Sequence, residues 1–357
     1  MDRERRIPLS GFEKLKEWTE GIPSVNVEEE QKAREHIDQL TKPQGALGEL
    51  ETILVRLAGI TGQAQPSIEN KGVVVFCGDH GVTAEGVSAY PVEVTGLMMQ
   101  NFSWGKAAVH VWARRFGARV IVVDVGSRLE GVPDGVIERK VRRGTVNMTQ
   151  GPAMSQEEAL KSIHIGLETA EGLKKEGMQL VATGEMGIGN TTAAAAVASV
   201  LTGESVERVT GRGTGLDDTG LKRKQEVIRR SLEVNRPDPR DPLDVLAKVG
   251  GLEVGAMAGL MLGAARQRLP VVLDGVISTV AALVAIRIAP QVQPYLFASH
   301  LSVEPAHGLL LEELGLQPLI TAGMRLGEGS GAVLAFPLFD AAVTAAQEMA
   351  TFSELGL

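Results

Sequence analysis

The chain of 357 residues is poor in cysteine, in aromatic side chains and in long apolar runs. Its single cysteine, Cys77, cannot form an intrachain disulfide, which is typical of a protein from a reducing compartment. Only 4% of the residues are aromatic, so a surface that stacks many RNA bases or sugar rings is not expected. The apolar stretch from Gly275 to Ile286 is shorter than the ~20 residues that a membrane helix needs. We therefore predict a cytoplasmic protein with no membrane partner.

Positive charge is also in short supply. Lysine and arginine together number 36, against 44 aspartates and glutamates, which gives a net charge of −8 at pH 7. A protein that binds nucleic acid through its phosphates needs a strong positive field, so nucleic acid is not expected as a partner. The content of 44% hydrophobic and 22% charged residues is ordinary for a globular protein. The length predicts two domains, or one large α/β domain with an appendage.

Short apolar runs alternate with helical patterns from Lys71 onwards, whereas the first 60 residues show only helical patterns. This alternation predicts an α/β fold with a mainly parallel, Rossmann-like sheet and helices on both faces. In such sheets ligands bind beyond the carboxyl ends of the strands, so we expect one pocket built from several loops. A final apolar stretch, Gly331 to Ala350, predicts a long helix broken at Pro337. The predicted strands are residues 73–76, 120–125, 180–183, 271–273 and 295–298.

The segment Gly184 to Thr192 lies between a predicted strand and an alanine-rich helix at 193–200. Its glycines let the backbone approach a ligand closely, and the free amides at the helix start, with the threonine hydroxyls, can hold a phosphate. The alternative is a tight strand-to-helix turn capped by Thr191. The segment matches neither the P-loop pattern nor the dinucleotide-binding fingerprint.

A second glycine-rich segment, Gly211 to Asp218, opens a predicted helix at 221–234. That helix begins with Lys222, Arg223 and Lys224, whose charge could complete a phosphate site together with the loop amides. The alternative is that these basic residues form a solvated helix face.

A third segment, Arg325 to Gly331, places Glu328 alone among glycines just before an apolar helix. A carboxylate that projects into a cleft and loses its water has a raised pKa, as a general base at neutral pH requires. The alternative is an acidic residue stabilised by the helix dipole at a helix start.

Two further polar groups are candidates for catalysis or metal binding. Asp79 and His80 follow the predicted strand at 73–76 and could be catalytic, or could form a pair that only pins the loop. His300, Glu304 and His307 would share one face of a continuous helix, but the proline at position 305 argues against such a helix. We therefore predict no metal site.

Taken together, these segments resemble the nicotinate-nucleotide:dimethylbenzimidazole phosphoribosyltransferase family, of the lower-ligand branch of cobalamin synthesis. The resemblance implies transfer of the 5-phosphoribosyl group from nicotinate mononucleotide to 5,6-dimethylbenzimidazole, giving α-ribazole 5′-phosphate and nicotinate with inversion at the anomeric carbon. It also implies that Glu328 is the catalytic base and that no metal or cofactor takes part. The matching segments follow the family order and span most of the chain: Lys42–Glu51, Gly78–Val82, Gly184–Thr192, Gly211–Asp218, Lys248–Gly251, Leu273–Gly275, Ser299–His300 and Arg325–Gly331.

The resemblance further implies a set of substrate-binding residues. A large apolar wall predicts a preference for benzimidazoles over phenols and purines, although the same reaction with another benzimidazole, adenine or a phenol stays open. The donor's phosphate and ribose would be held by Gly187, Gly189, Asn190, Thr191, Thr192, Gly211, Gly213 and Lys224. Glu185 would lie near the acceptor or near the base. The acceptor would lie against Tyr90, Met98 and Met186, and we add Ser88, Asp274 and Arg325 to the binding set.

The family resemblance also implies an architecture and an assembly. A small helical domain is expected from residues 1–40 and 332–357, beside an α/β catalytic domain of residues 41–331, in a homodimer. A protein that binds nucleotides or bases without catalysis is the alternative class. The carboxylate at Glu328 disfavours that alternative, because a protein that only binds would not need it.

Overall fold

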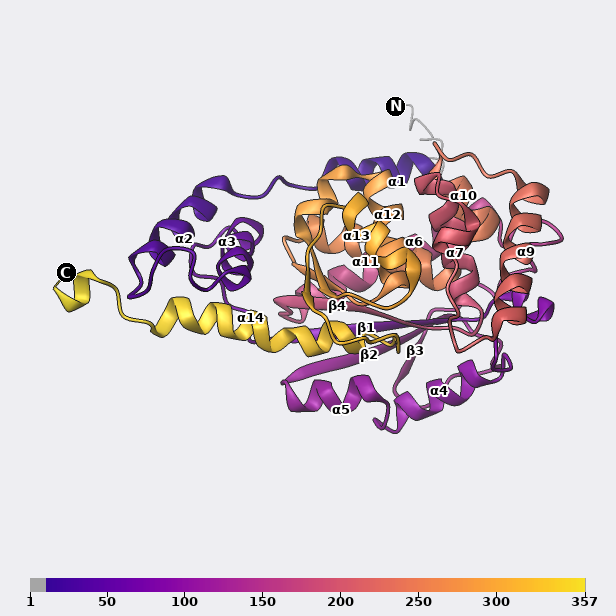
Figure 1. The fold of residues 1–357 in the computed structure, drawn as a ribbon, viewed down its shortest axis with the longest axis horizontal. Helices are drawn as coiled ribbons and strands as arrows, with labels where there is room; N and C mark the ends of the chain where they lie inside the picture. Colours follow the sequence, from indigo (N-terminus) through magenta and orange to yellow (C-terminus); the bar gives the residue numbers. More distant parts are fainter. Residues whose placement is uncertain (1–10, 357) are drawn as a thin grey trace, which may run out of the picture.

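The computed structural model describes residues 11–356, whose centre is a sheet of seven parallel strands in the order β3-β2-β1-β4-β5-β6-β7. Helices cover both faces of this sheet (Figure 1), so the predicted α/β class is confirmed. The strand order reverses between β1 and β4, which creates a crevice at their carboxyl ends where ligands bind in open α/β sheets. The strands are β1 (Lys71–Gly78), β2 (Ala118–Gly126), β3 (Val136–Glu138), β4 (Leu180–Met186), β5 (Val271–Leu273), β6 (Leu296–His300) and β7 (Pro318–Ile320).

All five predicted strands are present, and the two edge strands, β3 and β7, were missed. β1 is buried along its whole length, so its sequence is a continuous apolar run. The edge strands have three residues each and are half-buried or exposed for most of their length. A strand that is neither long nor fully buried leaves too weak an apolar pattern to be recognised.

One face of the sheet is covered by α4, α5 and the start of α14, and the other by α11 and α12, with α6 packed behind α11 (Figure 1). Residues 1–10 of the predicted helical start lie outside the described residues. The helices are α1 (Gly11–Glu20), α2 (Val27–Gln39), α3 (Glu49–Thr61), α4 (Val94–Ser103), α5 (Ala108–Arg115), α6 (Gln156–Lys175), α7 (Asn190–Thr202), α8 (Val206–Val209), α9 (Asp218–Asn235), α10 (Pro242–Val249), α11 (Leu252–Arg266), α12 (Val276–Ile288), α13 (Pro305–Glu313) and α14 (Ser330–Glu348), with short 3₁₀ helices at Gly81–Glu85, Pro290–Tyr295 and Ser353–Leu355.

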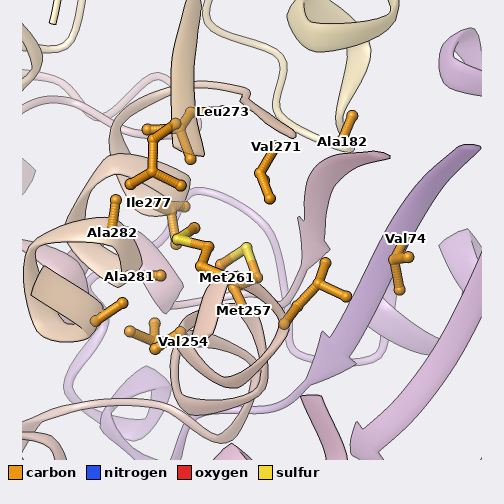
Figure 2. Close-up of a cluster of buried hydrophobic side chains, with 14 of the residues drawn as sticks. Val74, Ala182, Val254, Met257, Met261, Val271, Leu273, Ile277, Ala281 and Ala282 are labelled. Atoms are coloured by element: carbon orange, nitrogen blue, oxygen red, sulfur yellow. The ribbon is translucent and has the colours of Figure 1, made fainter. Parts of the chain in front are cut away.

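The core beside the crevice is built from small and medium-sized apolar side chains. Figure 2 shows α11 and α12 packed against the central strands. Burial of each Val, Leu, Ile or Met side chain contributes about 1.5–3 kcal/mol, so this layer holds the strand ends firmly in place. The labelled residues are Val74, Ala182, Val254, Met257, Met261, Val271, Leu273, Ile277, Ala281 and Ala282, all of them buried.

Helices α6 and α11 pack so closely that their backbones touch. A Cβ atom at Gly166 would collide with the carbonyl oxygen of Ala256, and one at Gly259 would collide with that of Ile163. Glycine is required at both positions because the obstacle is backbone, which cannot rotate away as a side chain can. This helix pair therefore forms a second, rigid layer behind the sheet.

Helix α14 runs without interruption through Pro337, so the predicted break is wrong. The proline removes the N–H that would bond the carbonyl of Val333, but packing of the helix against β4, β6, α5 and α3 outweighs that loss. Among residues 11–356, α14 alone is long and apolar enough to span a membrane by length and composition. More than half of the residues in the apolar stretch of α14 are buried inside the fold. Asp340, which also lies on α14, forms an ion pair with Lys71 at 2.7 Å.

The far half of α14 lies beside α2 and α3, apart from the sheet (Figure 1). An isolated bridge between Leu40 and Thr351 joins the end of α2 to the segment after α14. Helix α1, in contrast, packs on α6 of the central body. The segment after α14 thus meets the end of α2, while α1 lies on the central body, and the boundaries 1–40 and 332–357 stay a prediction.

Candidate active site

A cavity of about 350 Å³ opens at the carboxyl ends of the strands. Its walls come from the loops after β1, β4, β5, β6 and β7 and from the segment before α9. The cavity thus lies on the side of the sheet where the strand order places a ligand site. Of the predicted residues, the structure brings together Ser88, Tyr90, Glu185, Met186, Gly187, Gly189, Asn190, Thr191, Gly213, Asp274, Arg325 and Glu328 around it.

Four predicted residues lie outside the cavity lining. Thr192 is buried in the first turn of α7, and Lys224 is buried on α9 behind the cavity wall. Gly211 packs against Glu304, and Met98 is half-buried on α4 against the core. In this conformation these four residues can affect a substrate only through the lining residues that they hold in place.

The structure also adds residues that the sequence did not single out as substrate-binding. Seven of the twelve lie within six residues after the predicted strands at 271–273 and 295–298, and that position was the signal that could have identified them. The other five each adjoin a predicted residue, and three of them are apolar side chains, which a search for polar motifs overlooks. These added lining residues are Val87, Ile188, Thr214, Gly275, Val276, Ile277, Ser278, His300, Ser302, Glu304, Leu326 and Gly327.

Glu328 is held in a strained loop at the start of α14. Its φ of 65° lies in the left-handed region, as do those of Gly327 and Gly329 at 85° and 82°. The side chain is 6% exposed, and its Oε2 atom has no hydrogen-bond partner among the described residues. Burial and the charge of Asp274 raise the pKa of Glu328 to about 7. The backbone N–H of Val109 has the opposite effect and lowers this pKa in part. A carboxyl group with this pKa can take up and release a proton near neutral pH.

Asp274 fastens this loop to the end of β5. Its Oδ2 accepts a hydrogen bond from the N–H of Gly329 at 3.0 Å, and its Oδ1 accepts bonds from those of Gly331 and Ala332 at 2.7 and 3.2 Å. Burial raises the pKa of the Asp274 carboxyl, while His300 and these three N–H groups oppose the rise. Asp274 therefore caps α14 and positions Glu328, with its carboxylate already occupied by backbone donors.

Glu185, at the end of β4, faces the same cavity. Its Oε2 accepts a hydrogen bond from the side-chain amide of Asn190. Burial raises its pKa well above the ordinary value, as do the charges of Asp274, Glu253 and Glu328. A Cβ atom at Gly327 would lie 2.5 Å from Glu185 Oε1, so the Glu328 loop passes directly over this carboxyl group. The crowding of carboxylates favours the protonated form of Glu185, which leaves Glu328 as the better base.

The loop from Gly187 to Asn190 leads from β4 into α7. Gly189 is the N-cap of α7 with a φ of 95°. The N–H of Asn190 donates to the carbonyl of Gly187 at 3.1 Å and that of Thr192 to the carbonyl of Gly189 at 3.0 Å, whereas the N–H of Thr191 has no acceptor among the described residues. A Cβ atom at Gly187 would collide with the carbonyl oxygen of Gly78. The loop therefore requires glycine for close packing, and it presents a helix N-terminus suited to an anion.

The second glycine-rich loop is tied to this first one. Lys224 Nζ donates hydrogen bonds to Thr191 Oγ1 at 2.8 Å and to the carbonyl of Gly211 at 3.2 Å. Burial lowers the pKa of Lys224 to about 8, although the charge of Glu304 raises it in part. Glu304 Oε1 in turn accepts a hydrogen bond from the N–H of Gly213 at 3.0 Å. Lys224 from behind the wall and Glu304 from within the cavity lining thus position the two loops against each other.

Two more contacts close the rim of the cavity. Ser88 Oγ lies 3.3 Å from Thr214 Oγ1, which also accepts a hydrogen bond from the N–H of Ala89 at 3.2 Å. Arg325 donates to the carbonyl of Gly213 at 3.2 Å. The loops after β1 and β7 therefore meet the segment before α9 at the cavity mouth.

The three residues considered for a metal do not share one helix face. His300 ends β6, Glu304 is the N-cap of α13, and His307 lies inside α13. His307 Nδ1 accepts a hydrogen bond from the N–H of Ser302 at 2.8 Å, and Nε2 donates to Thr279 Oγ1 at 3.0 Å, so both ring nitrogens are occupied. Burial lowers the pKa of His307 to about 3. Within residues 11–356 no group of three or more His, Cys, Asp or Glu is arranged to hold a metal.

Asp79 and His80 lie below the cavity rather than in its lining. Asp79 Oδ2 accepts a hydrogen bond from the N–H of Arg128 at 2.8 Å, and His80 Nε2 donates to Glu253 Oε1 at 2.8 Å. Of the two alternatives left by the sequence, these contacts favour a pair that pins the loop after β1.

Comparison with known proteins agrees with this geometry. A family model described as "Phosphoribosyltransferase" matches residues 22–357. The chain is 55% identical over 326 residues to the nicotinate-nucleotide–dimethylbenzimidazole phosphoribosyltransferase of Desulforudis audaxviator, covering 91% of this chain and 92% of that one. It is 49% identical over 346 residues to the protein of the same name from Halalkalibacterium halodurans, covering 97% of each.

The same family appears among solved structures. The crystal structure of the nicotinate-nucleotide–dimethylbenzimidazole phosphoribosyltransferase from Thermus thermophilus matches with a TM-score of 0.87 and 47% identity, over 93% of this chain and 98% of that one. The resemblance seen in the sequence is therefore confirmed, and the chain belongs to the nicotinate-nucleotide–dimethylbenzimidazole phosphoribosyltransferase family.

Proposed function

We propose that this chain transfers the 5-phosphoribosyl group from nicotinate mononucleotide to 5,6-dimethylbenzimidazole, giving α-ribazole 5′-phosphate and nicotinate. The names of its relatives supply the substrates. The observation that carries the proposal is Glu328, a buried carboxyl group with a pKa of about 7 and a free oxygen, in a cavity that also contains a glycine-rich helix start.

In the proposed reaction Glu328 is the general base. One nitrogen of the benzimidazole attacks C1′ of the donor while the other loses its proton to the Glu328 carboxylate. The bond from C1′ to the pyridinium nitrogen breaks, and its electron pair neutralises the positive charge on that nitrogen. Attack from the face opposite the departing nicotinate inverts C1′. This balance needs only a positioned base, because the leaving group is already activated.

The donor's phosphate would bind at the start of α7. The N–H of Thr191 and the dipole of α7 attract an anion to this helix start, and with 13 residues α7 is long enough for a full dipole. Lys224 supports the site from behind by holding Thr191 and the carbonyl of Gly211. We propose that Gly187, Gly189, Asn190 and Thr191 contact the donor, and that Thr192, Gly211 and Lys224 act through the loops that they hold.

The acceptor would lie against the apolar part of the lining, which includes Val87, Tyr90, Met186, Ile277 and Leu326. A flat, mostly apolar ring suits this wall better than a purine does, because the polar edge of a purine would lose its water without gaining partners. The alternative is the same transfer to another acceptor, such as a different benzimidazole, adenine or a phenol.

We also propose that the protein works as a cytoplasmic homodimer with the helical and catalytic domains divided at 1–40 and 332–357 against 41–331. Light scattering during size-exclusion chromatography tests the dimer, because it should return twice the mass of one chain. A single-chain mass at assay concentration would contradict it.

The reaction is tested by mixing the full-length protein with nicotinate mononucleotide and an equimolar panel of acceptors. The panel contains benzimidazole, 5,6-dimethylbenzimidazole, methoxybenzimidazole, adenine and p-cresol, and products are identified by liquid chromatography and mass spectrometry. The expected result is α-ribazole 5′-phosphate as the main product, with an equal amount of nicotinate. Release of nicotinate with a different main product would establish the alternative acceptor, and a folded protein that makes no product would contradict transferase activity.

A further inference from the structure

A buried histidine–glutamate pair lies directly beneath the glycine-rich loop of the cavity. His80, just after β1, donates from Nε2 to Glu253 Oε1 at 2.8 Å across 173 residues of sequence. Both side chains are buried, with 1% and 0% of their surface exposed. Neither residue lines the cavity, so the reaction proposed above gives them no role.

The imidazole of His80 is clamped between the start of α11 and the glycine loop. A Cβ atom at Gly251 would lie 2.5 Å from His80 Cε1, on the α11 side. On the other side, a Cβ atom at Gly187 would lie 3.5 Å from His80 Cδ2, and one at Gly189 would lie 3.1 Å from His80 Cβ. The side chain of His80 therefore packs directly against the loop from Gly187 to Gly189 and supports it from the side of α11.

Glu253 depends on this histidine for its charge compensation. Its Oε1 accepts the bond from His80, and its Oε2 has no hydrogen-bond partner among the described residues. The neighbouring charges are those of Asp79, Glu185 and Arg128. Arg128 acts on His80 and does not pair with Glu253, whose one salt-bridge partner among the described residues is His80. Without His80 the carboxylate would be buried and unpaired, which is strongly unfavourable and would force the surrounding backbone to rearrange.

We propose that His80 and Glu253 are a positioning pair: they fix the backbone of the Gly187–Asn190 loop in the position in which it binds the donor's phosphate. The inference rests on the proposed function, because it assumes that the phosphate binds at this loop. The pair acts through the backbone of the loop and does not touch the substrates. Its loss should therefore weaken binding of the donor while leaving the acceptor wall, which Tyr90 and Ile277 help to form, unchanged.

The test compares His80→Asn, Glu253→Gln and the double variant with wild type. His80→Asn should raise the KM and the Kd for nicotinate mononucleotide about tenfold, well within the effect of a ~1 Å displacement of a binding group. The KM for dimethylbenzimidazole should change less than about twofold. Glu253→Gln keeps an oxygen for His80 Nε2–H and should have a smaller effect. The double variant should recover part of the loss, because it no longer contains an unpaired buried carboxylate.

Asp340→Asn is the matched control. Asp340 pairs with Lys71 at 2.7 Å at the opposite end of the same strand, so its removal also breaks a partly buried ion pair anchored on β1. This variant should lower the melting temperature without changing the donor's Kd. If His80→Asn behaves in the same way, or weakens donor and acceptor equally, the pair is only structural and the inference is wrong.

Two outcomes need separate readouts. If His80→Asn does not fold, Glu253→Gln and the double variant carry the test, and wild-type donor binding in both would overturn the inference. If the wild-type protein makes no product, the proposed function fails on its own. Calorimetric titration of nicotinate mononucleotide into wild type and His80→Asn still measures the donor's Kd in that case, and an equal Kd would overturn the positioning role as well.

Discussion

Glycine has two different uses in two regions of this molecule. In the loops around the cavity it permits positive φ angles, as at Gly189 and Gly327. In the paired helices α6 and α11 it permits backbone contact, as at Gly166 and Gly259. The first use shapes a ligand site and stores strain, whereas the second removes free space and adds rigidity. Substitutions in the two regions should therefore separate activity from stability.

The largest expected effect is on activity and comes from Glu328→Gln. The amide keeps the shape of the side chain but cannot accept the acceptor's proton, so kcat should fall about 10²- to 10⁴-fold. The melting temperature should change little, because Glu328 Oε2 has no hydrogen bond to lose. Steady-state kinetics and calorimetric binding of nicotinate mononucleotide check both statements. Near wild-type turnover would move the role of base to another group, with Glu185 next in line.

Gly166→Ala should produce the converse result. The added methyl group would meet the carbonyl of Ala256, and relief requires the two helices to separate. We expect a loss of stability of about 3 kcal/mol with nearly unchanged kcat in the protein that remains folded. Urea unfolding and activity per folded molecule measure the two quantities. As a control, Gly172→Ala on the same helix has open space around it and should cost nothing.

The pH dependence of activity should follow the proton on Glu328. Its pKa is raised to about 7, and the base is the deprotonated form, so kcat/KM should fall about tenfold per pH unit below 7 and level off above it. Because kcat/KM reports the free enzyme, its profile for the acceptor is the appropriate measurement. A limb with a midpoint near 4.5, the ordinary value for a glutamate, would show that the carboxyl is not desolvated in the free enzyme.

The smallest expected effect concerns acceptor choice. Tyr90 lines the cavity, so Tyr90→Ser should shift the product ratio a few-fold from benzimidazoles towards more polar acceptors. Met98 was predicted from the sequence to share this wall, but it lies on α4 outside the lining, so Met98→Gln should change the ratio less. A competition assay with the acceptor panel measures both variants. Unchanged ratios with Tyr90→Ser would remove this side chain from the acceptor site.

The sequence predicted the features that have a strong local signal. The runs at 73–76 and 271–273 are apolar because their strands are buried, and the glycines at 187 and 189 mark a strand-to-helix turn. The break predicted at Pro337 is wrong because a local rule for helix ends ignores the packing that holds both halves of α14. The edge strands β3 and β7 were missed since three partly exposed residues carry little pattern.

The sequence by itself determined the fold class, the family and the order of the loops that meet at the carboxyl ends of the strands, because these depend on local periodicity and on short segments. Only the tertiary structure decided which residues share the cavity, and that Met98 and Lys224 do not line it. It also decided the state of Glu328, because the raised pKa comes from burial beside Asp274, 54 residues earlier in the chain. Burial and charge act through space, so no local pattern in the sequence records them.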